Sequence, residues 1–326
     1  MKIWKKVTGI IVTVSLIAGL TACSGGDKET KNEAENLVIA YQSSIAYAPL
    51  VVMKEQKLIE KYYGKDLSVD WKIMANGSAI NDGITAGSVD VGAMGVAPAI
   101  TGMKAGIPYK IFAGMSSQPY GILTNKKEIN SLKDITSDDQ IAITNINSQP
   151  HILLAMAAKA ELGNARALDG NLTVLANADG YSSILSGAVS CHMVISPYNF
   201  MELENEKVHE IEVGEDVWPN GNTFIVGVAS TKLKEEKPEL YDALCKAMEE
   251  AVTYIDNNQE ATAKLIAQDY DASEKEILSW MQDEGSNYTT KLQGVMELSN
   301  FMVEEGFLEN GPKDIREIAF DNVQGE

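Results

Sequence analysis

The sequence predicts an α/β fold built from two similar lobes that face each other across a cleft. Strand-like and helix-like segments alternate along residues 37–115, which is typical of a mostly parallel sheet with helices on both faces. The same order of segments returns about 100 residues later, in residues 141–195. Solenoids need about three repeats or more, so two copies favour a facing pair of lobes.

The first 22 residues indicate an export signal that is not part of the fold. Three lysines precede the apolar run Val7–Leu20, which is too short for a transmembrane span of roughly 20 residues. The segment Leu20–Cys23 then resembles a bacterial lipobox, in which the cysteine is acylated and starts the mature chain. We therefore expect Cys23 to carry a lipid that holds the protein at the cell membrane, outside the cytoplasm. An uncleaved signal anchor is the alternative.

Residues 23–36 are polar and charged, with too little apolar surface to fold, and are expected to form a flexible tether. About 290 residues remain, enough for one large or two medium domains. We expect the first lobe to comprise residues 37–120 and 223–326, and the second lobe to comprise residues 121–222.

Each element of the first lobe is predicted from its own residues. Asn76 and Gly77 indicate a turn, Ser78 a helix N-cap, and Gly87 the end of that helix. The turn 95–98 consists of small residues, which let a ligand approach the backbone closely. In order, the predicted elements are strand 37–41, helix 49–62, strand 67–73, helix 78–86, strand 89–94, helix 97–104 and strand 109–114.

The second lobe repeats this pattern with the same spacing. Ile84, Gly87 and Val89 recur 100 positions later as Ile184, Gly187 and Val189, and Pro98 recurs one step out of register as Pro197. The predicted elements are strand 141–144, helix 150–162, strand 171–175, helix 180–186 and strand 191–195.

Two segments are expected to connect the lobes, and the carboxyl-terminal part is expected to be helical. Residues 120–124 lead into the second lobe, and the apolar strand 223–229 carries the chain back. From residue 234 onward, including segments 258–269, 273–283 and 289–305, helical spacing predicts helices that cover the first sheet. Trp280 and Met302 are expected in its core.

The charge of the chain excludes one class of partner. Removal of the signal would change the formal net charge from −19 to −22, so no nucleic-acid binding is expected. Arg166 and Arg316 are the only arginines, which disfavours an arginine clamp for an anion. Cys191 and Cys245 could pair outside the cell, but a buried free thiol is the expectation for Cys245.

Several motifs identify a resemblance to a known superfamily. The segments Gly77–Ser78, Ala86–Asp90, Gly95–Pro98 and Lys104–Pro108 resemble the solute-binding proteins of nitrate, sulfonate and taurine ABC importers. The superfamily includes binding proteins for thiamine pyrimidine precursors and riboflavin. The resemblance extends from residue 37 to about residue 269. It implies a type II periplasmic-binding-protein-like fold: two α/β lobes around a ligand cleft, with two crossover strands.

One position departs from the pattern of the superfamily. The second lobe usually carries an acidic residue where this chain has Ser190, followed by Cys191 and His192, whereas the first lobe has Asp90. The resemblance therefore gives less support to the ligand contacts expected from the second lobe than to those expected from the first.

The expected binding residues lie at strand ends and helix starts, where sheets of this kind bind ligands. Serines at helix starts could instead only cap the helices, and the tyrosines could only pack. In the first lobe the expected residues are Gln42, Ser43, Tyr47, Gly77, Ser78, Gly95, Val96, Ser116 and Ser117. In the second lobe they are Asn147, Ser148, His151, Tyr181, Tyr198 and Asn222.

The resemblance implies an extracytoplasmic solute-binding component of an ABC importer, acting as a monomer with the permease and its ATPase as partners. It implies capture of a small anion, such as an alkanesulfonate, taurine or nitrate, by closure of the cleft. Tyrosines at strand ends fit a pyrimidine thiamine precursor or another heteroaromatic ligand equally well. A surface sensor module with no transport role is a further alternative.

An enzyme is not expected. The sequence contains no Gly-x-Ser-x-Gly elbow, His-Glu-x-x-His motif, phosphate-binding loop or Gly-x-Gly-x-x-Gly motif. Its three histidines, His151, His192 and His209, are scattered. We therefore expect no catalytic residues, no metal site and no cofactor.

Overall fold

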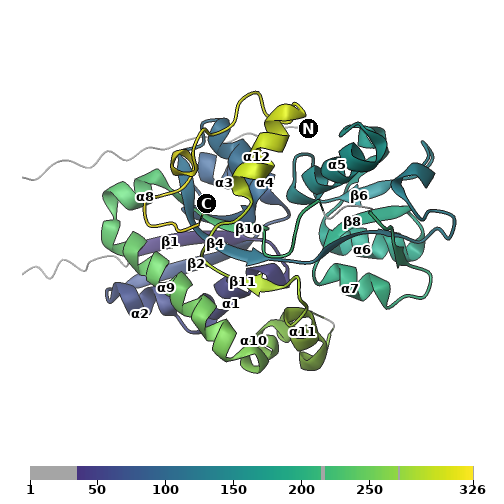
Figure 1. The fold of residues 1–326 in the computed structure, drawn as a ribbon. Coiled ribbons are helices and arrows are strands. Elements are labelled where there is room, and N and C mark those ends of the chain that lie inside the picture. Colours follow the sequence, from purple (N-terminus) through teal and green to yellow (C-terminus); the bar gives the residue numbers. More distant parts are fainter. Residues whose placement is uncertain (1–34, 214–216, 271, 326) are drawn as a thin grey trace, which may run out of the picture. The chain divides into compact units, whose positions relative to one another are not determined.

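Two β-sheets organise the molecule, and helices pack against each of them (Figure 1). The structure is a computed structural model that describes residues 35–213, 217–270 and 272–325. The predicted signal peptide, Cys23 and most of the predicted tether lie outside the described residues. The last two tether residues, Glu35 and Asn36, already belong to the first strand. The predicted α/β fold with two sheets is confirmed.

The first sheet has six strands in the order β11-β4-β10-β3-β1-β2. Strand β1 pairs in parallel with β2 and β3, whereas β10 runs antiparallel between β3 and β4, and β11 adds a short antiparallel edge. The bounds are β1 Glu35–Tyr41, β2 Leu67–Ile73, β3 Val91–Gly95, β4 Tyr109–Ser117, β10 Ile225–Ser230 and β11 Asn287–Tyr288.

The second sheet has five strands in the order β7-β6-β8-β5-β9. Strand β6 pairs in parallel with β7 and β8, and β5 runs antiparallel between β8 and β9. The bounds are β5 Tyr120–Thr124, β6 Ile141–Ile143, β7 Leu172–Val174, β8 Cys191–Ile195 and β9 His209–Glu210.

The two sheets share one plan. Strands β2-β1-β3-β10-β4 correspond in order and direction to β7-β6-β8-β5-β9. In each case the antiparallel strand directly follows a strand of the other sheet: β5 comes after β4, and β10 comes after β9. The chain therefore crosses between the sheets twice, as the predicted crossover strands require.

The part of the chain that the structure describes contains twelve α-helices. The carboxyl-terminal helices pack on the side of the first sheet, where α9 contacts α1 and α2. Their bounds are α1 Ala48–Glu55, α2 Leu58–Tyr63, α3 Gly77–Thr85, α4 Val96–Lys104, α5 Gln149–Leu162, α6 Asn177–Ser186, α7 Tyr198–Leu203, α8 Thr231–Glu236, α9 Pro238–Asn257, α10 Gln259–Ile266, α11 Glu274–Met281 and α12 Val295–Glu304. Within the described residues, no helix combines the length and apolar character that crossing a bilayer requires.

Three helix predictions are corrected. Of the predicted helical segment 289–305, only α12, from Val295 to Glu304, is helical. The predicted helix 49–62 is broken between α1 and α2, because Lys57 adopts a left-handed backbone with φ of 51°. The N-cap of α3 is Asn76, not Ser78: the Asn76 side chain accepts a hydrogen bond from the Ala79 N–H at 3.0 Å. Ser78 lies inside the first turn because the extended backbone that a cap needs occurs at Asn76.

The core contains the residues expected there, with one exception. Trp280 and Met302 are buried. Cys191 and Cys245 are both free thiols, but Cys245 is only half-buried, contrary to the expectation. It lies at the edge of the apolar stripe of α9, where the Asn322 amide approaches its sulfur at 3.7 Å.

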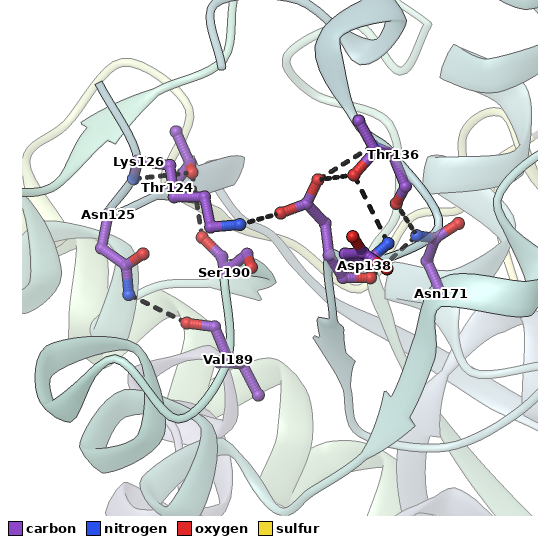
Figure 2. A network of polar contacts seen from close by, with 9 residues as sticks. Thr124, Asn125, Lys126, Thr136, Asp138, Asn171, Val189 and Ser190 are labelled. Carbon is purple, nitrogen blue, oxygen red and sulfur yellow. Dashed lines mark hydrogen bonds and ion pairs between the residues drawn. The ribbon is translucent and has the colours of Figure 1, made fainter. Parts of the chain in front are cut away.

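A polar network joins the loops at the amino ends of β6 and β8, with the Asn125 amide donating to Val189 O and the Thr124 hydroxyl donating to Ser190 O (Figure 2). The Asp139 carboxylate accepts from the Thr136 N–H and hydroxyl and pairs with Lys126. Burial alone would raise the pKa of Asp139, but these donors outweigh it and lower the pKa.

Replacing Asp139 by asparagine is expected to lower the free energy of unfolding at pH 7 by about 1.5–3 kcal/mol. Because the fold lowers the pKa of Asp139, the carboxylate stabilises the fold above its unfolded pKa of ~3.9, and this stabilisation is lost as the pH falls further. Urea unfolding of wild type and variant measures the difference. It should be smaller at pH 3 than at pH 7, and an equal difference at both would contradict the role of the charge.

Candidate functional site

A cleft lies where the carboxyl ends of the parallel strands of the two sheets meet. The space between its lining atoms is about 350 Å³, including solvent at its mouth. One wall comes from the first sheet and its helices: Gln42, Tyr47, Gly77, Gly95, Pro98, Phe224 and Ile225. The other comes from the second: Thr144, Ser148, Gln149, Pro150, Asn177 and Ile195.

Four helices begin at this cleft. Gly77 is the first residue of α3 and Asn177 the first of α6, while Gly95 precedes α4 and Ser148 precedes α5 as its N-cap. Each sheet contributes two of these helices. The dipole at a helix start favours negative charge, and N–H groups left unpaired there can bind an anion. At α4 the Val96 and Ala97 N–H groups already donate to Phe224 O and Gln149 Oε1, so this helix contributes only its dipole. The four ends together make the cleft a favourable place for an anionic group.

The described residues that line the cleft include no carboxylate, lysine, arginine or histidine. Arg166 pairs with Asp169, and Arg316 pairs with Asp314, both away from the lining. Tyr47 accepts a hydrogen bond from the Gln42 amide at 2.7 Å, and burial raises its pKa, so its hydroxyl stays neutral. A bound anion would meet amides and hydroxyls rather than cationic side chains.

A second, more open compartment adjoins the cleft and shares Gln42 and Asn177 with it; the space between its lining atoms is about 520 Å³, including open solvent. Its other lining residues are mostly apolar, and the side chain of Ile73 at its rim is 65% exposed. These residues are Ser43, Ile73, Met74, Ala75, Ala176, Ala178 and Tyr198. We call it the outer compartment; it could accept the uncharged part of a ligand.

Hydrogen bonds join the two walls around the cleft. The Ser44 hydroxyl donates to Ser196 O at 2.7 Å, in a buried position. The Ala97 N–H, in the first turn of α4, donates to Gln149 Oε1 at 2.9 Å. The Asn145 amide also donates to the Ser78 hydroxyl. The walls are therefore in direct contact in this structure.

The structure brings seven of the fifteen predicted binding residues to the cleft or its outer compartment: Gln42, Ser43, Tyr47, Gly77, Gly95, Ser148 and Tyr198. Ser78 lies beside them, bonded across the walls to Asn145. The remaining seven do not line either space.

Three of those seven have polar groups engaged by backbone carbonyl groups. The Val96 N–H donates to Phe224 O at 3.2 Å, so it is not exposed as expected. The Ser116 hydroxyl donates to Ala46 O, and the Ser117 hydroxyl donates to Gly285 O. Both serines lie at the carboxyl end of β4, where binding residues were expected. The chain crosses to the second sheet at this point, and their hydroxyls bind backbone carbonyl groups instead of facing the cleft.

The other four lie around α5, α6 and the second crossover. His151 Nδ1 accepts from the Asn147 N–H at 2.9 Å, and its ring packs edge-on against Phe307. Burial lowers the pKa of His151, which favours the neutral ring. Tyr181 packs against Tyr198 with ring centroids 6.0 Å apart, and Asn222 is buried beside Gly294.

Sequence reasoning missed several lining residues, notably Thr144, Gln149 and Asn177. Gln149 Nε2 and Asn177 Oδ1 are buried and have no hydrogen-bond partner among the described residues. Their positions carried a usable signal, because Gln149 starts α5 and Asn177 starts α6. A rule that takes each residue beginning a helix after a strand would have included both.

Comparison with known proteins identifies the family of the chain. A model of the NMT1-like family matches residues 30–269, which is well over half of the sequence. The chain belongs to the NMT1-like family. This NMT1-like chain is 23% identical over 255 residues to an aliphatic sulfonates-binding protein of Escherichia coli (strain K12), covering 77% of this chain and 76% of the relative.

Solved structures support the fold of this NMT1-like protein. The alkanesulfonate-binding protein SsuA from Xanthomonas axonopodis pv. citri, bound to MOPS, superposes with a TM-score of 0.70 at 18% identity, covering 90% of this chain and 100% of that one. The periplasmic nitrate-binding protein NrtA from Synechocystis PCC 6803 gives 0.71 at 16% identity, covering 90% and 86%. The periplasmic binding protein fold is thereby confirmed.

The comparisons also confirm the predicted class of protein. The sulfonates-binding relative and the two similar structures are binding proteins. The NMT1-like chain is therefore a solute-binding protein, and the resemblance found in its sequence is correct at this level.

Proposed function

We propose that the chain is the extracytoplasmic solute-binding component of an ABC importer and that it captures an organic anion of the alkanesulfonate type. The observation that carries the proposal is the convergence of four helix starts, two from each wall, on a cleft whose described lining has no charged side chain. Each helix start stabilises an anion by roughly 0.3–2 kcal/mol. The sulfonate-binding relative and the alkanesulfonate-binding structure support the same choice.

The outer compartment selects among anions. An alkyl chain could pack against Met74, Ala75 and Ala178, with the oxyanion at the helix starts. Nitrate has no such chain, and the ammonium of taurine would find no carboxylate in either lining. We therefore rank an unsubstituted alkanesulfonate above taurine and nitrate.

Closure follows from the same geometry. Residues 37–120 with 223–326 form one proposed lobe and residues 121–222 the other, joined by the two crossovers. A ligand that contacts both walls favours the closed arrangement only through contacts that the open one lacks. The permease and its ATPase would then recognise the closed form, and an acylated Cys23 would keep the monomeric protein near them.

A heteroaromatic ligand, such as a pyrimidine, is the second candidate. Tyr47 lines the cleft and Tyr198 lines the outer compartment, so either ring could pack against a flat ligand. A sensor module without transport would use the same cleft, and absence of solute uptake in cells lacking the protein would separate transport from sensing.

Titration calorimetry with butanesulfonate, methanesulfonate, 1-butanol, nitrate, taurine and an aminopyrimidine tests the proposal. Butanesulfonate should bind about 10- to 50-fold more tightly than methanesulfonate, because each buried methylene contributes ~0.8 kcal/mol. 1-Butanol, which has the chain without the anion, should bind more weakly than either. Tight binding of the aminopyrimidine with no binding of any sulfonate would overturn the choice of an anion.

A further inference from the structure

Gln149 both lines the cleft and forms a hydrogen bond to the opposite wall. It is the first residue of α5, its side chain is 1% exposed, and it lines the cleft. The side chain reaches the opposite wall, where its Oε1 accepts a hydrogen bond from the Ala97 N–H at 2.9 Å.

This hydrogen bond fixes which end of the amide faces the cleft. The Ala97 N–H can only donate, so the oxygen of Gln149 must face it, and the NH₂ group must occupy the other position. Nε2 is buried and has no partner among the residues that the structure describes. The walls also approach closely here, since a Cβ added to Gly95 would lie 2.7 Å from Gln149 Cβ. The amide therefore has little freedom to turn away.

We infer that Gln149 is a specificity-determining residue: its NH₂ group donates a hydrogen bond to the anionic oxygen of the ligand while its oxygen holds α4 of the opposite wall. The inference rests on the proposed function, because it assumes that the ligand presents an oxyanion. A buried donor without an acceptor is unfavourable, so a ligand oxygen at this point satisfies a group that the protein leaves unpaired. A ligand that presents only donors there is rejected.

Two substitutions separate recognition of the ligand from contact between the walls. Gln149→Glu keeps an oxygen that accepts from the Ala97 N–H, but it replaces the donor facing the ligand by a negatively charged acceptor. Gln149→Met keeps the approximate size of the side chain and removes both hydrogen bonds. If Gln149 contacts the ligand, the glutamate variant should bind butanesulfonate more weakly than the methionine variant. If Gln149 only joins the walls, the order should be reversed.

The readout is the affinity for butanesulfonate by titration calorimetry at pH 7. We expect a loss of roughly 100-fold for Gln149→Glu and roughly 10-fold for Gln149→Met. The matched control is Gln259→Glu, the same change at the first residue of α10, where the Gln259 oxygen accepts from the Gln282 amide outside the cleft. Thermal unfolding of each variant without ligand checks that the fold is retained.

A pH profile adds a readout that a purely structural role would not produce. Protonation of the introduced carboxyl restores a donor, so the affinity of Gln149→Glu should recover as the pH falls. The wild-type affinity should stay flat, because the tyrosines of the two linings, Tyr47 and Tyr198, have raised pKa values and remain neutral. Affinity retained by Gln149→Glu at pH 7 would overturn this inference and leave the proposed function intact. Failure of the wild type to bind any sulfonate would overturn both.

Discussion

Replacing Gly95 by alanine is expected to lower the affinity for the solute about 10- to 100-fold with little change in the stability of the fold. The new Cβ would lie 2.7 Å from Gln149 Cβ on the opposite wall, and a Cβ cannot move away without its backbone. Overpacking of this kind costs ~1–3 kcal/mol, and each 1.4 kcal/mol is about tenfold in affinity. The cost falls only on the arrangement in which the walls touch.

The backbone at Gly95 does not itself require glycine. Its φ of −58° and ψ of 154° suit alanine, so the first lobe should fold normally. Calorimetry measures the affinity and thermal unfolding the stability. Gly170→Ala is the matched control, because its added Cβ would meet no atom within 4 Å. Unchanged affinity in Gly95→Ala would show that binding does not require the walls to approach as they do here.

The second large effect is expected at a buried histidine–glutamate pair that joins β8 to α7. His192 Nδ1 lies 2.6 Å from Glu202 Oε1, and both side chains are fully buried. Replacing His192 by alanine should lower the free energy of unfolding by about 3–5 kcal/mol, because it leaves the Glu202 carboxylate buried without its partner. Urea unfolding measures this loss.

Two further variants define the cause of that loss. His192→Leu combined with Glu202→Leu should recover much of the stability, since an apolar pair carries no desolvation penalty. His209→Ala serves as the control: its ring contacts Ile129 O at 2.8 Å at a half-buried position, so a loss of only ~1 kcal/mol is expected. If His192→Ala were no more harmful than His209→Ala, the buried pair would not stabilise the lobe.

The buried histidine–glutamate pair also affects the wall of the cleft. It joins β8 to α7, and a Cβ added to Gly180 of α6 would lie 2.5 Å from His192 Nε2. Strand β8 ends, and helices α7 and α6 begin, with a residue that lines the cleft or the outer compartment. These residues are Ile195, Tyr198 and Asn177. The variants at His192 should therefore weaken ligand binding as well as stability.

Local patterns in the sequence predicted much of the fold. The β-branched and apolar residues of β2 and β8 define strands whose bounds match the predicted ones, and Gly87 ends α3 with φ of +70°. The choice between Asn76 and Ser78 as N-cap could not be made in this way. Both side chains can cap a helix, and only the extended backbone at Asn76 decides between them.

The binding residues were predictable where strand ends alone decide their position. Gln42 and Tyr47 follow β1, and Gly95 is the last residue of β3; the carboxyl ends of both strands face the cleft. Ser117 also ends a strand, but its hydroxyl bonds backbone that arrives from residues far away in the sequence. Gln149 was not predicted but lines the cleft. Its position depends on a hydrogen bond from Ala97 of the other wall, which no local pattern in the sequence reveals.

The unusual Ser190 has a structural explanation of the same kind. In the first lobe the Asp90 carboxylate accepts from the Val38 N–H of β1. In the second lobe the buried carboxylate comes from Asp139, just before β6, and the Ser190 hydroxyl helps to lower its pKa. The acidic side chain of this pair of strands thus lies before β6 rather than before β8, so the serine at position 190 leaves no gap in the network.

The placement of β10 bears on how the polypeptide matures. All strands of the second sheet lie within the continuous stretch 120–210, whereas the first sheet needs residues 225–230 inserted between β3 and β4. A nascent chain that emerges amino end first can thus complete the second sheet before the first one, although the first sheet begins earlier in the sequence. Until then β3 and β4 lack the neighbour between them, and the exposed edges are the surface that a holding chaperone would have to cover.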